Sequence, residues 1–187
     1  MNDSSPEQAR EPRRRRISIA GIVALLVGAC LLALLAYGVA GVVRTSKDEA
    51  RMWACLSNLK LVMQATQMYA TDHSDHFPPS DSWPTALSPY LKASTALLCP
   101  ADRRAERQGV GDLRTSYTMN LACGGAEAKM GKAGDVPVLW DGEVLSGGRG
   151  SLAPRHWSHM ANVGFADGYV KGVIPQVFET LSLTPSR

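Results

Sequence analysis

Residues 17–43 read ISIAGIVALLVGACLLALLAYGVAGVV, and this stretch decides the architecture of the chain. It contains no charged residue, no Asn, no Gln and no Pro. About 20 apolar residues in a helix cross the hydrocarbon core of a bilayer, and this stretch is longer. Because hydrocarbon offers the backbone no hydrogen-bond partners, we predict that the whole stretch is a transmembrane helix.

Four consecutive arginines, residues 13–16, stand directly before this stretch. Cationic flanks stay on the cytoplasmic side, so we expect residues 1–16 to form a disordered, basic cytoplasmic arm. Residues 44–187 are then one exported domain, and the protein is a single-pass protein of the cytoplasmic (inner) membrane. A cleaved signal peptide is the alternative, but its apolar region would be only about 7–15 residues long.

The charge balance of the exported part excludes one class of partner. From Arg44 onward the chain has 15 Lys and Arg against 14 Asp and Glu, so the excess positive charge lies in the N-terminal arm. Nucleic-acid binding requires a face with a clear positive bias, and we therefore expect no nucleic-acid partner. Membrane lipid is the partner that the composition supports.

The segment after the anchor keeps a helical pattern of apolar residues. Residues 46–49, Ser-Lys-Asp-Glu, have the spacing of a capping box, so they either begin a new helix or form the charged surface of a continuing one. From there to Tyr69 the apolar side chains recur on one stripe, which needs a partner surface to bury it. The members of this stripe are Met52, Cys55, Leu56, Leu59, Val62, Met63, Thr66 and Tyr69.

The rest of the chain predicts a small antiparallel sheet. Residues 82–91 suit a short helical turn, and residues 116–122 and 136–140 read as strands. The fold class that we predict is α+β. It consists of a long N-terminal helix, transmembrane in its first half and amphipathic in its second, packed on this sheet.

The clearest local pattern is a hairpin near the C-terminus. Two short apolar runs flank Asp167-Gly168, a pair that suits a two-residue type I′ turn with positive φ at both positions. In that register Phe165 faces Val170, and Val163 shares their side of the sheet. This predicts an apolar face that lies against the amphipathic helix.

The order of these parts resembles type IV pilins and type II secretion pseudopilins. Within that group the chain is similar to a bacterial family of prepilin-like proteins with a C-terminal His-(about nine residues)-Asp-Gly motif. The resemblance covers roughly residues 17–174. The segments that carry it are residues 50–60, the turn at residues 99–102, residues 116–120, and a terminal motif containing His156, Asn162, Phe165, Asp167 and Gly168.

The resemblance implies a pilin-like fold and a structural or interaction role. It also implies that the partners are other pilin-like subunits or secretion components. The family's cleavage site has Glu at the fifth position after Gly, whereas Gly21 here is followed by Ile-Val-Ala-Leu-Leu and the anchor holds no Glu. We therefore expect the anchor to be retained.

Three cysteines, Cys55, Cys99 and Cys123, lie in the exported part, while Cys30 lies in the anchor. An exported compartment permits disulfides, so three cysteines allow one bridge and one free thiol. We expect Cys99 to be bridged, with either of the other two as its partner. The resemblance favours Cys55, because both positions fall in family-like segments.

Two histidine groups are candidate ligand sites. His156, His159 and Asp167 offer the imidazole and carboxylate groups that zinc accepts, and they would serve a membrane-tethered metal-binding protein or enzyme. His73 and His76, three residues apart at the helix end, form the second group. Turn chemistry already explains Asp167, so we expect structural roles, with no metal, no cofactor and no catalytic activity.

Overall fold

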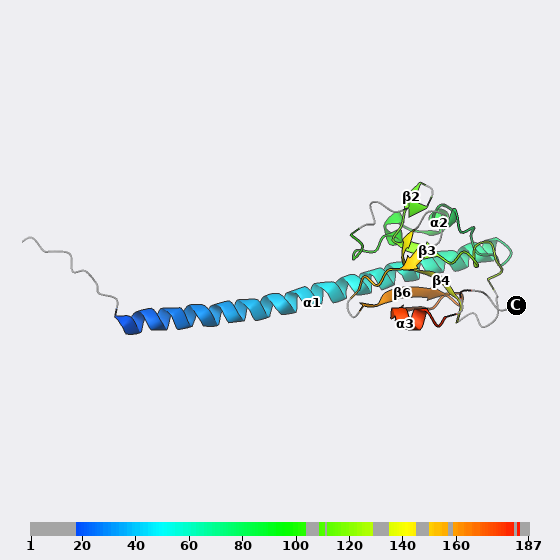
Figure 1. Cartoon of the computed structure of the whole chain (residues 1–187). Helices are drawn as coiled ribbons and strands as arrows, with labels where there is room; N and C mark the ends of the chain where they lie inside the picture. The colour runs from blue at the N-terminus through cyan, green and yellow to red at the C-terminus, as the bar shows by residue number, and fades with distance from the viewer. Residues whose placement is uncertain are drawn as a thin grey trace, which may run out of the picture. The chain divides into compact units, whose positions relative to one another are not determined.

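The computed structural model separates the chain into two compact units, Met1–Val43 and Arg44–Arg187. Each unit is described by itself, and Figure 1 shows the elements along the chain. The residues that the structure describes are 18–103, 109–110, 112–128, 135–144, 150–156, 159–181 and 183.

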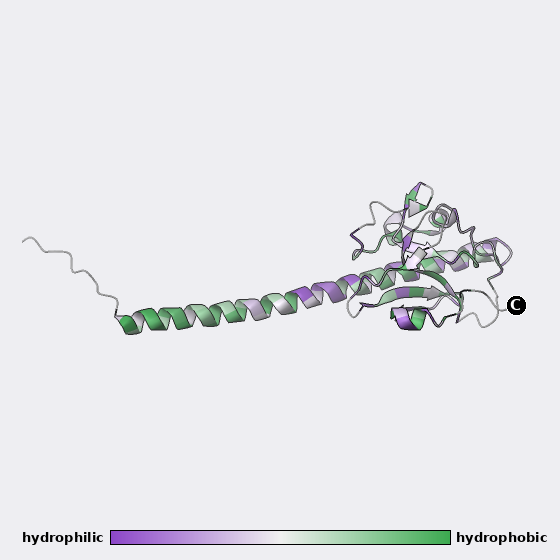
Figure 2. Ribbon diagram, viewed as in Figure 1, coloured by the Kyte–Doolittle hydropathy of each residue, from purple (hydrophilic) through white to green (hydrophobic). Residues whose placement is uncertain are grey.

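The described part of the first unit is the beginning of helix α1 (Ile19–Asp72). Figure 2 shows this part as an almost continuously apolar stretch. Its most apolar window has a mean hydropathy of 2.8, and none of that window is buried in the protein. By length and composition, this helix can span a membrane. The predicted basic arm and residue 17 lie outside the described residues.

Helix α1 continues past Ser46 without a break, so the capping-box residues form the surface of a continuing helix. Within the second unit the predicted stripe is the buried face of α1, which confirms the amphipathic pattern. Met52, Leu56 and Tyr69 are only half-buried at its margin. The buried residues are Cys55, Leu59, Val62, Met63, Ala65, Thr66 and Ala70.

The predicted α+β fold is confirmed, because α1 packs on an antiparallel sheet. The sheet has the strand order β3-β4-β6-β7, and β5 pairs with the far end of β4. The remaining elements are α2 (Trp83–Leu87), η1 (Ser88–Tyr90), η2 (Ser94–Leu97), β1 (Gly109–Val110), β2 (Leu113–Arg114), β3 (Tyr117–Met119), β4 (Pro137–Val144), β5 (Gly150–Leu152), β6 (Ala161–Phe165), β7 (Val170–Val173) and α3 (Pro175–Phe178).

The C-terminal hairpin exists, but its predicted turn and register are wrong. Gly168 has φ +86°, whereas Asp167 is not among the residues with positive φ. The Gly168 N–H donates to the Phe165 carbonyl at 2.8 Å, and the Phe165 N–H donates to the Tyr169 carbonyl at 2.8 Å. These bonds define a three-residue loop with one left-handed glycine, which moves the register by one residue and pairs Gly164 with Val170.

The register change reassigns the faces of the hairpin. Val163 and Phe165 do not pack against α1. They form a separate cluster with Trp140 and Val173, against which Phe178 of α3 packs. Figure 1 shows α1 and α3 on opposite sides of β6. Val163 and Phe165 share one face, as predicted, but Val170 lies in the main core instead, and the partner of the Val163 and Phe165 face is the C-terminal segment.

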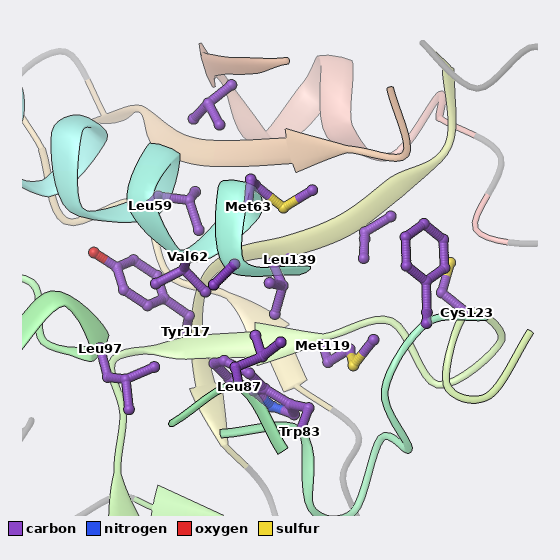
Figure 3. Packing of buried hydrophobic residues seen from close by; sticks show 14 of the residues in the cluster. Leu59, Val62, Met63, Trp83, Leu87, Leu97, Tyr117, Met119, Cys123 and Leu139 are labelled. Atoms are coloured by element: carbon purple, nitrogen blue, oxygen red, sulfur yellow. The ribbon is translucent and has the colours of Figure 1, made fainter. Parts of the chain in front are cut away.

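The main core lies on the α1 side of the sheet. Figure 3 shows Leu59, Val62 and Met63 of α1 pointing toward Tyr117 and Leu139 of the sheet. Gly164 permits this close approach, because a Cβ there would lie 2.6 Å from the Met63 Cγ and Sδ atoms. Helix α1 therefore packs closely on β6 at Gly164, which has no side chain.

Candidate functional site

The described residues contain a buried polar cluster on His156, which follows β5. The side chains of His156 and Asp141 are 1% and 0% exposed. The His156 Nε2 atom lies 2.8 Å from the Asp141 Oδ2 atom. Asp141 is on β4, where its backbone carbonyl also accepts a hydrogen bond from the Ala153 N–H at 2.9 Å. Strand pairing thus fixes the carboxylate beneath the imidazole.

Asn162 of β6 completes the cluster from the neighbouring strand. Its backbone N–H donates to the Asp141 Oδ2 atom at 2.7 Å, and its Nδ2 atom lies 3.0 Å from His156 Nε2. An imidazole nitrogen carries either a proton or a lone pair. It therefore satisfies the carboxylate as a donor or the amide as an acceptor, but not both.

The cluster also holds two buried polar atoms that find no hydrogen-bond partner among the described residues. They are Asp141 Oδ1 and His156 Nδ1. An unsatisfied buried polar atom costs about 1–3 kcal/mol. The hydrogen-bonding capacity of the cluster is therefore incompletely used, although the Asp141 Oδ2 atom has two close polar neighbours.

Arg155 ties the cluster to the surrounding backbone. Its Nη1 and Nη2 atoms donate to the carbonyls of Ser116 and Gly142 at 2.9 and 2.7 Å. Its Nη2 atom also lies 3.4 Å from the Asp102 Oδ2 atom, and both side chains of this pair are largely buried. The guanidinium therefore joins the residue before β3, strand β4 and the turn after Cys99, which positions the next residue, His156.

A disulfide also lies next to the imidazole. It joins Cys55 of α1 to Cys99, 44 residues further along the chain. The Cys99 Sγ atom is 3.9 Å from His156 Nε2. Of the three predicted candidates, the remaining one, Cys123, is a buried free thiol. Burial raises the pKa of Cys123 to about 12.

Tyr117 contacts the site from the core. Its phenol donates to the Cys55 backbone carbonyl at 3.2 Å. Burial, followed by the nearby Asp141 carboxylate, raises the pKa of Tyr117 well above its ordinary value. The phenol therefore remains a protonated donor, and it holds the backbone of the bridged cysteine.

A cleft of about 460 Å³ reaches the cluster from outside. Cationic groups dominate its charged lining, although Asp48 at its edge forms an ion pair of 3.1 Å with Arg51. The lining residues are Asp48, Arg51, Pro100, Ala101, Arg103, Arg155 and His156. His156 is thus reached from this cleft, while its other neighbours remain in the core.

The structure separates the candidate ligands predicted from the sequence. His156 is buried in the cluster, but His159 is exposed and has φ 55°. Asp167 is exposed on the hairpin, where its Oδ1 atom accepts the Tyr169 N–H at 2.9 Å. In the described part of the chain, the group of three potential ligands that does form is Cys55, Cys99 and His156.

His73 and His76 also have local roles. The His73 ring stacks on Tyr69 with centroids 3.8 Å apart, and its Nδ1 atom lies 2.9 Å from the Tyr69 carbonyl. His76 Nδ1 lies 2.7 Å from the Ser74 carbonyl. Both rings therefore contact backbone carbonyls at the C-terminal end of α1, where Ser74 and Asp75 adopt left-handed backbone conformations.

Sequence reasoning missed Asp141, the central group of the cluster. One signal was present, because Asp141 directly follows the apolar run that predicted a strand at residues 136–140. A carboxylate that continues such a strand is buried only when it has a partner. The partner, His156, is 15 residues away, and only the strand pairing brings the two together.

The comparisons with known proteins give no match to this chain among family models, curated proteins or solved structures. The site is therefore interpreted from its own geometry.

Proposed function

We propose that the protein is a single-pass membrane protein whose C-terminal domain acts by binding other proteins. The observation that carries the proposal is the first stretch of α1, whose apolar window is entirely unburied. The core helix of a soluble protein buries such a surface, since exposing it to water is unfavourable. A lipid environment removes that cost.

The continuity of α1 argues against a removable signal sequence. The helix runs from Ile19 to Asp72, and Gly38 and Gly41 do not interrupt it. The apolar stretch also exceeds the length of a signal peptide's apolar region. We therefore propose that the anchor is retained, with the arginine-rich arm inside and residues 44–187 outside the cytoplasmic membrane.

The proposed role is non-catalytic and pilin-like. In the domain, Asp141 pairs with His156 and accepts the Asn162 N–H, while Arg155 donates to the carbonyls of Ser116 and Gly142, so these side chains hold several segments together. The sequence resemblance to pseudopilins supports other pilin-like subunits or secretion components as partners. His156, His159 and Asp167 do not form a common site, because His156 is buried whereas His159 and Asp167 are exposed.

The orientation is tested by protease protection. Protease added to spheroplasts should degrade the domain beyond Arg44 and leave an N-terminal tag intact, and inside-out vesicles should give the opposite pattern. A mature N-terminus near Ile22 or beyond Gly38 would contradict the retained anchor.

The interaction role is tested by crosslinking in intact membranes, followed by purification of the full chain. The matched control carries an unrelated transmembrane helix in place of residues 17–43. We expect the native chain to crosslink to specific proteins. The control, which keeps only the native exported domain, should crosslink to some of the same proteins. Recovery of the chain without any crosslinked protein would contradict the proposal.

A further inference from the structure

We propose that, when Cys55 and Cys99 are reduced, they bind one Zn²⁺ ion together with His156 and Asp141. The ion and the disulfide are then alternative ways of closing the same core site. The first observation is spatial: the ligand atoms of Cys55, Cys99 and His156 all lie within 4.8 Å of one another, and all three residues are buried. This inference does not depend on the proposed membrane function.

The distances fit one small ion. Ligand atoms around a tetrahedral zinc ion are about 3.6 Å apart for sulfur and nitrogen, and about 3.3 Å apart for oxygen and nitrogen. Here the Cys99 Sγ and His156 Nε2 atoms are 3.9 Å apart, and His156 Nε2 is 2.8 Å from Asp141 Oδ2. These two separations need to change by only about half an ångström or less, and reduction of the disulfide frees the two sulfur atoms to move apart to about 3.8 Å, the separation of zinc-bound thiolates.

The chemistry of the donors also fits. Two thiolates, an imidazole and a carboxylate are all zinc ligands, and their four atoms come from separate segments of the domain. A cation resolves the conflict at His156 Nε2, because it accepts the nitrogen lone pair and the carboxylate at the same time. Asp141, whose Oδ1 atom has no partner among the described residues, then gains a charge partner.

The two states exchange with a balanced stoichiometry. In the reduced chain, Zn²⁺ displaces one proton from each thiol and forms two zinc–sulfur bonds. A disulfide donor that oxidises the thiolates takes two electrons, forms the Cys55–Cys99 bond and releases the ion. In the reverse direction an external dithiol supplies the two electrons and leaves as a disulfide. A newly synthesised chain contains both thiols before any oxidant acts.

The ion has a route to the site. The cleft of about 460 Å³ is lined by His156 and by Pro100, the residue after Cys99. His156 lines the cleft, whereas neither Cys55 nor Cys99 does. His156 is the ligand that an entering ion meets first, so its removal should affect binding strongly.

The test uses the full chain in detergent, with Cys30→Ser so that only domain cysteines report. The protein is reduced without oxygen, the reductant is removed, and Co²⁺ is added as a spectroscopic substitute for Zn²⁺. We expect one equivalent to bind with a thiolate-to-cobalt charge-transfer band and the visible bands of tetrahedral Co²⁺. Zn²⁺ should displace it. With the oxidised protein, neither the charge-transfer band nor the visible bands of tetrahedral Co²⁺ should appear.

Variants separate the site from incidental thiol binding. His156→Ala should weaken Zn²⁺ binding at least about tenfold, since even outer-shell changes at zinc sites cost 10–100-fold. Cys123→Ser is the matched cysteine control and should bind as the parent does. Circular dichroism, together with disulfide formation in oxidised His156→Ala, establishes that this variant folds.

Three results would overturn the proposal. They are the absence of a charge-transfer band in the reduced parent, equal affinity of the parent and His156→Ala, and equal binding by the oxidised protein. A reduced parent that binds the ion only as an unfolded chain gives the second result, because the histidine then contributes nothing.

Discussion

Replacing Asp141 tests whether the buried cluster stabilises the domain. Its Oδ2 atom accepts the Asn162 N–H at 2.7 Å and lies 2.8 Å from His156 Nε2. Asp141→Ala removes the acceptor of both groups and leaves them buried. Each of the two unsatisfied buried groups costs about 1–3 kcal/mol, so we expect the free energy of unfolding to fall by about 2–6 kcal/mol.

Two further variants make the comparison specific. Asp141→Asn keeps an oxygen that can accept the Asn162 N–H, so we expect it to lose about half as much as Asp141→Ala. Glu179→Ala removes an exposed carboxylate after α3 and should change stability by less than about 0.5 kcal/mol. The test compares the loss of unfolding free energy on removing the buried carboxylate of Asp141 with the loss on removing the exposed carboxylate of Glu179.

The assay is urea unfolding of the oxidised full chain in detergent, followed by tryptophan fluorescence. Trp83 and Trp140 are 1% and 4% exposed and lie in the two separate core clusters, so they report on both sides of the sheet. Stability is compared through the midpoint at constant m value. An Asp141→Ala protein within about 0.5 kcal/mol of the parent would refute the reasoning.

Other measurements test the loop, the cysteines and the buried thiol. Gly168→Ala should cost about 1 kcal/mol, because φ is +86° although a Cβ there would make only an ordinary contact, 3.7 Å from the Gln67 Cγ atom. Asp167→Asn should change little in the same urea assay, and equal stability of Gly168→Ala and the parent would contradict the loop assignment. Thiol counting in denaturant should find two free thiols before reduction and four after it, since Cys55 and Cys99 are bridged, and four at the start would exclude the disulfide. The Cys123 pKa of about 12 lies above the usual value of about 8.5, so its contribution to stability is complete below about pH 8.5 and is lost as pH rises toward 12, because only the unfolded chain ionises in that interval. Urea titrations at a series of pH values should show a steeper alkaline decline for the parent than for Cys123→Ala.

The helix and the strands could be predicted because their information is local. The uncharged run at residues 17–43 and the stripe from Met52 to Tyr69 are periodic patterns within one segment. The stripe needs no knowledge of its partner to be recognised as a buried face. For the same reason the structure reproduces the α+β class and the burial of Cys55, Leu59 and Val62.

The hairpin register and the site could not be predicted, because they depend on pairing. Asp167-Gly168 fits two turns, and only the φ of Asp167 decides between a two-residue and a three-residue loop. One residue of difference then places Phe165 and Val170 on opposite sides of the sheet. The Asp141–His156 pair likewise joins strands whose adjacency no local pattern reveals.

The Cys55–Cys99 bond has a mechanical consequence for any tension applied along α1. Force applied to the N-terminal end of the domain reaches Cys55, and the disulfide transmits this force directly to Cys99. The segment between them, residues 56–98, cannot lengthen, although it includes the core-facing part of α1 together with α2, η1 and η2. At about 3.4 Å per extended residue, the disulfide prevents roughly 150 Å of chain from being extended. A pulling experiment would therefore record a shorter contour for the oxidised protein, and the load would fall on the sheet.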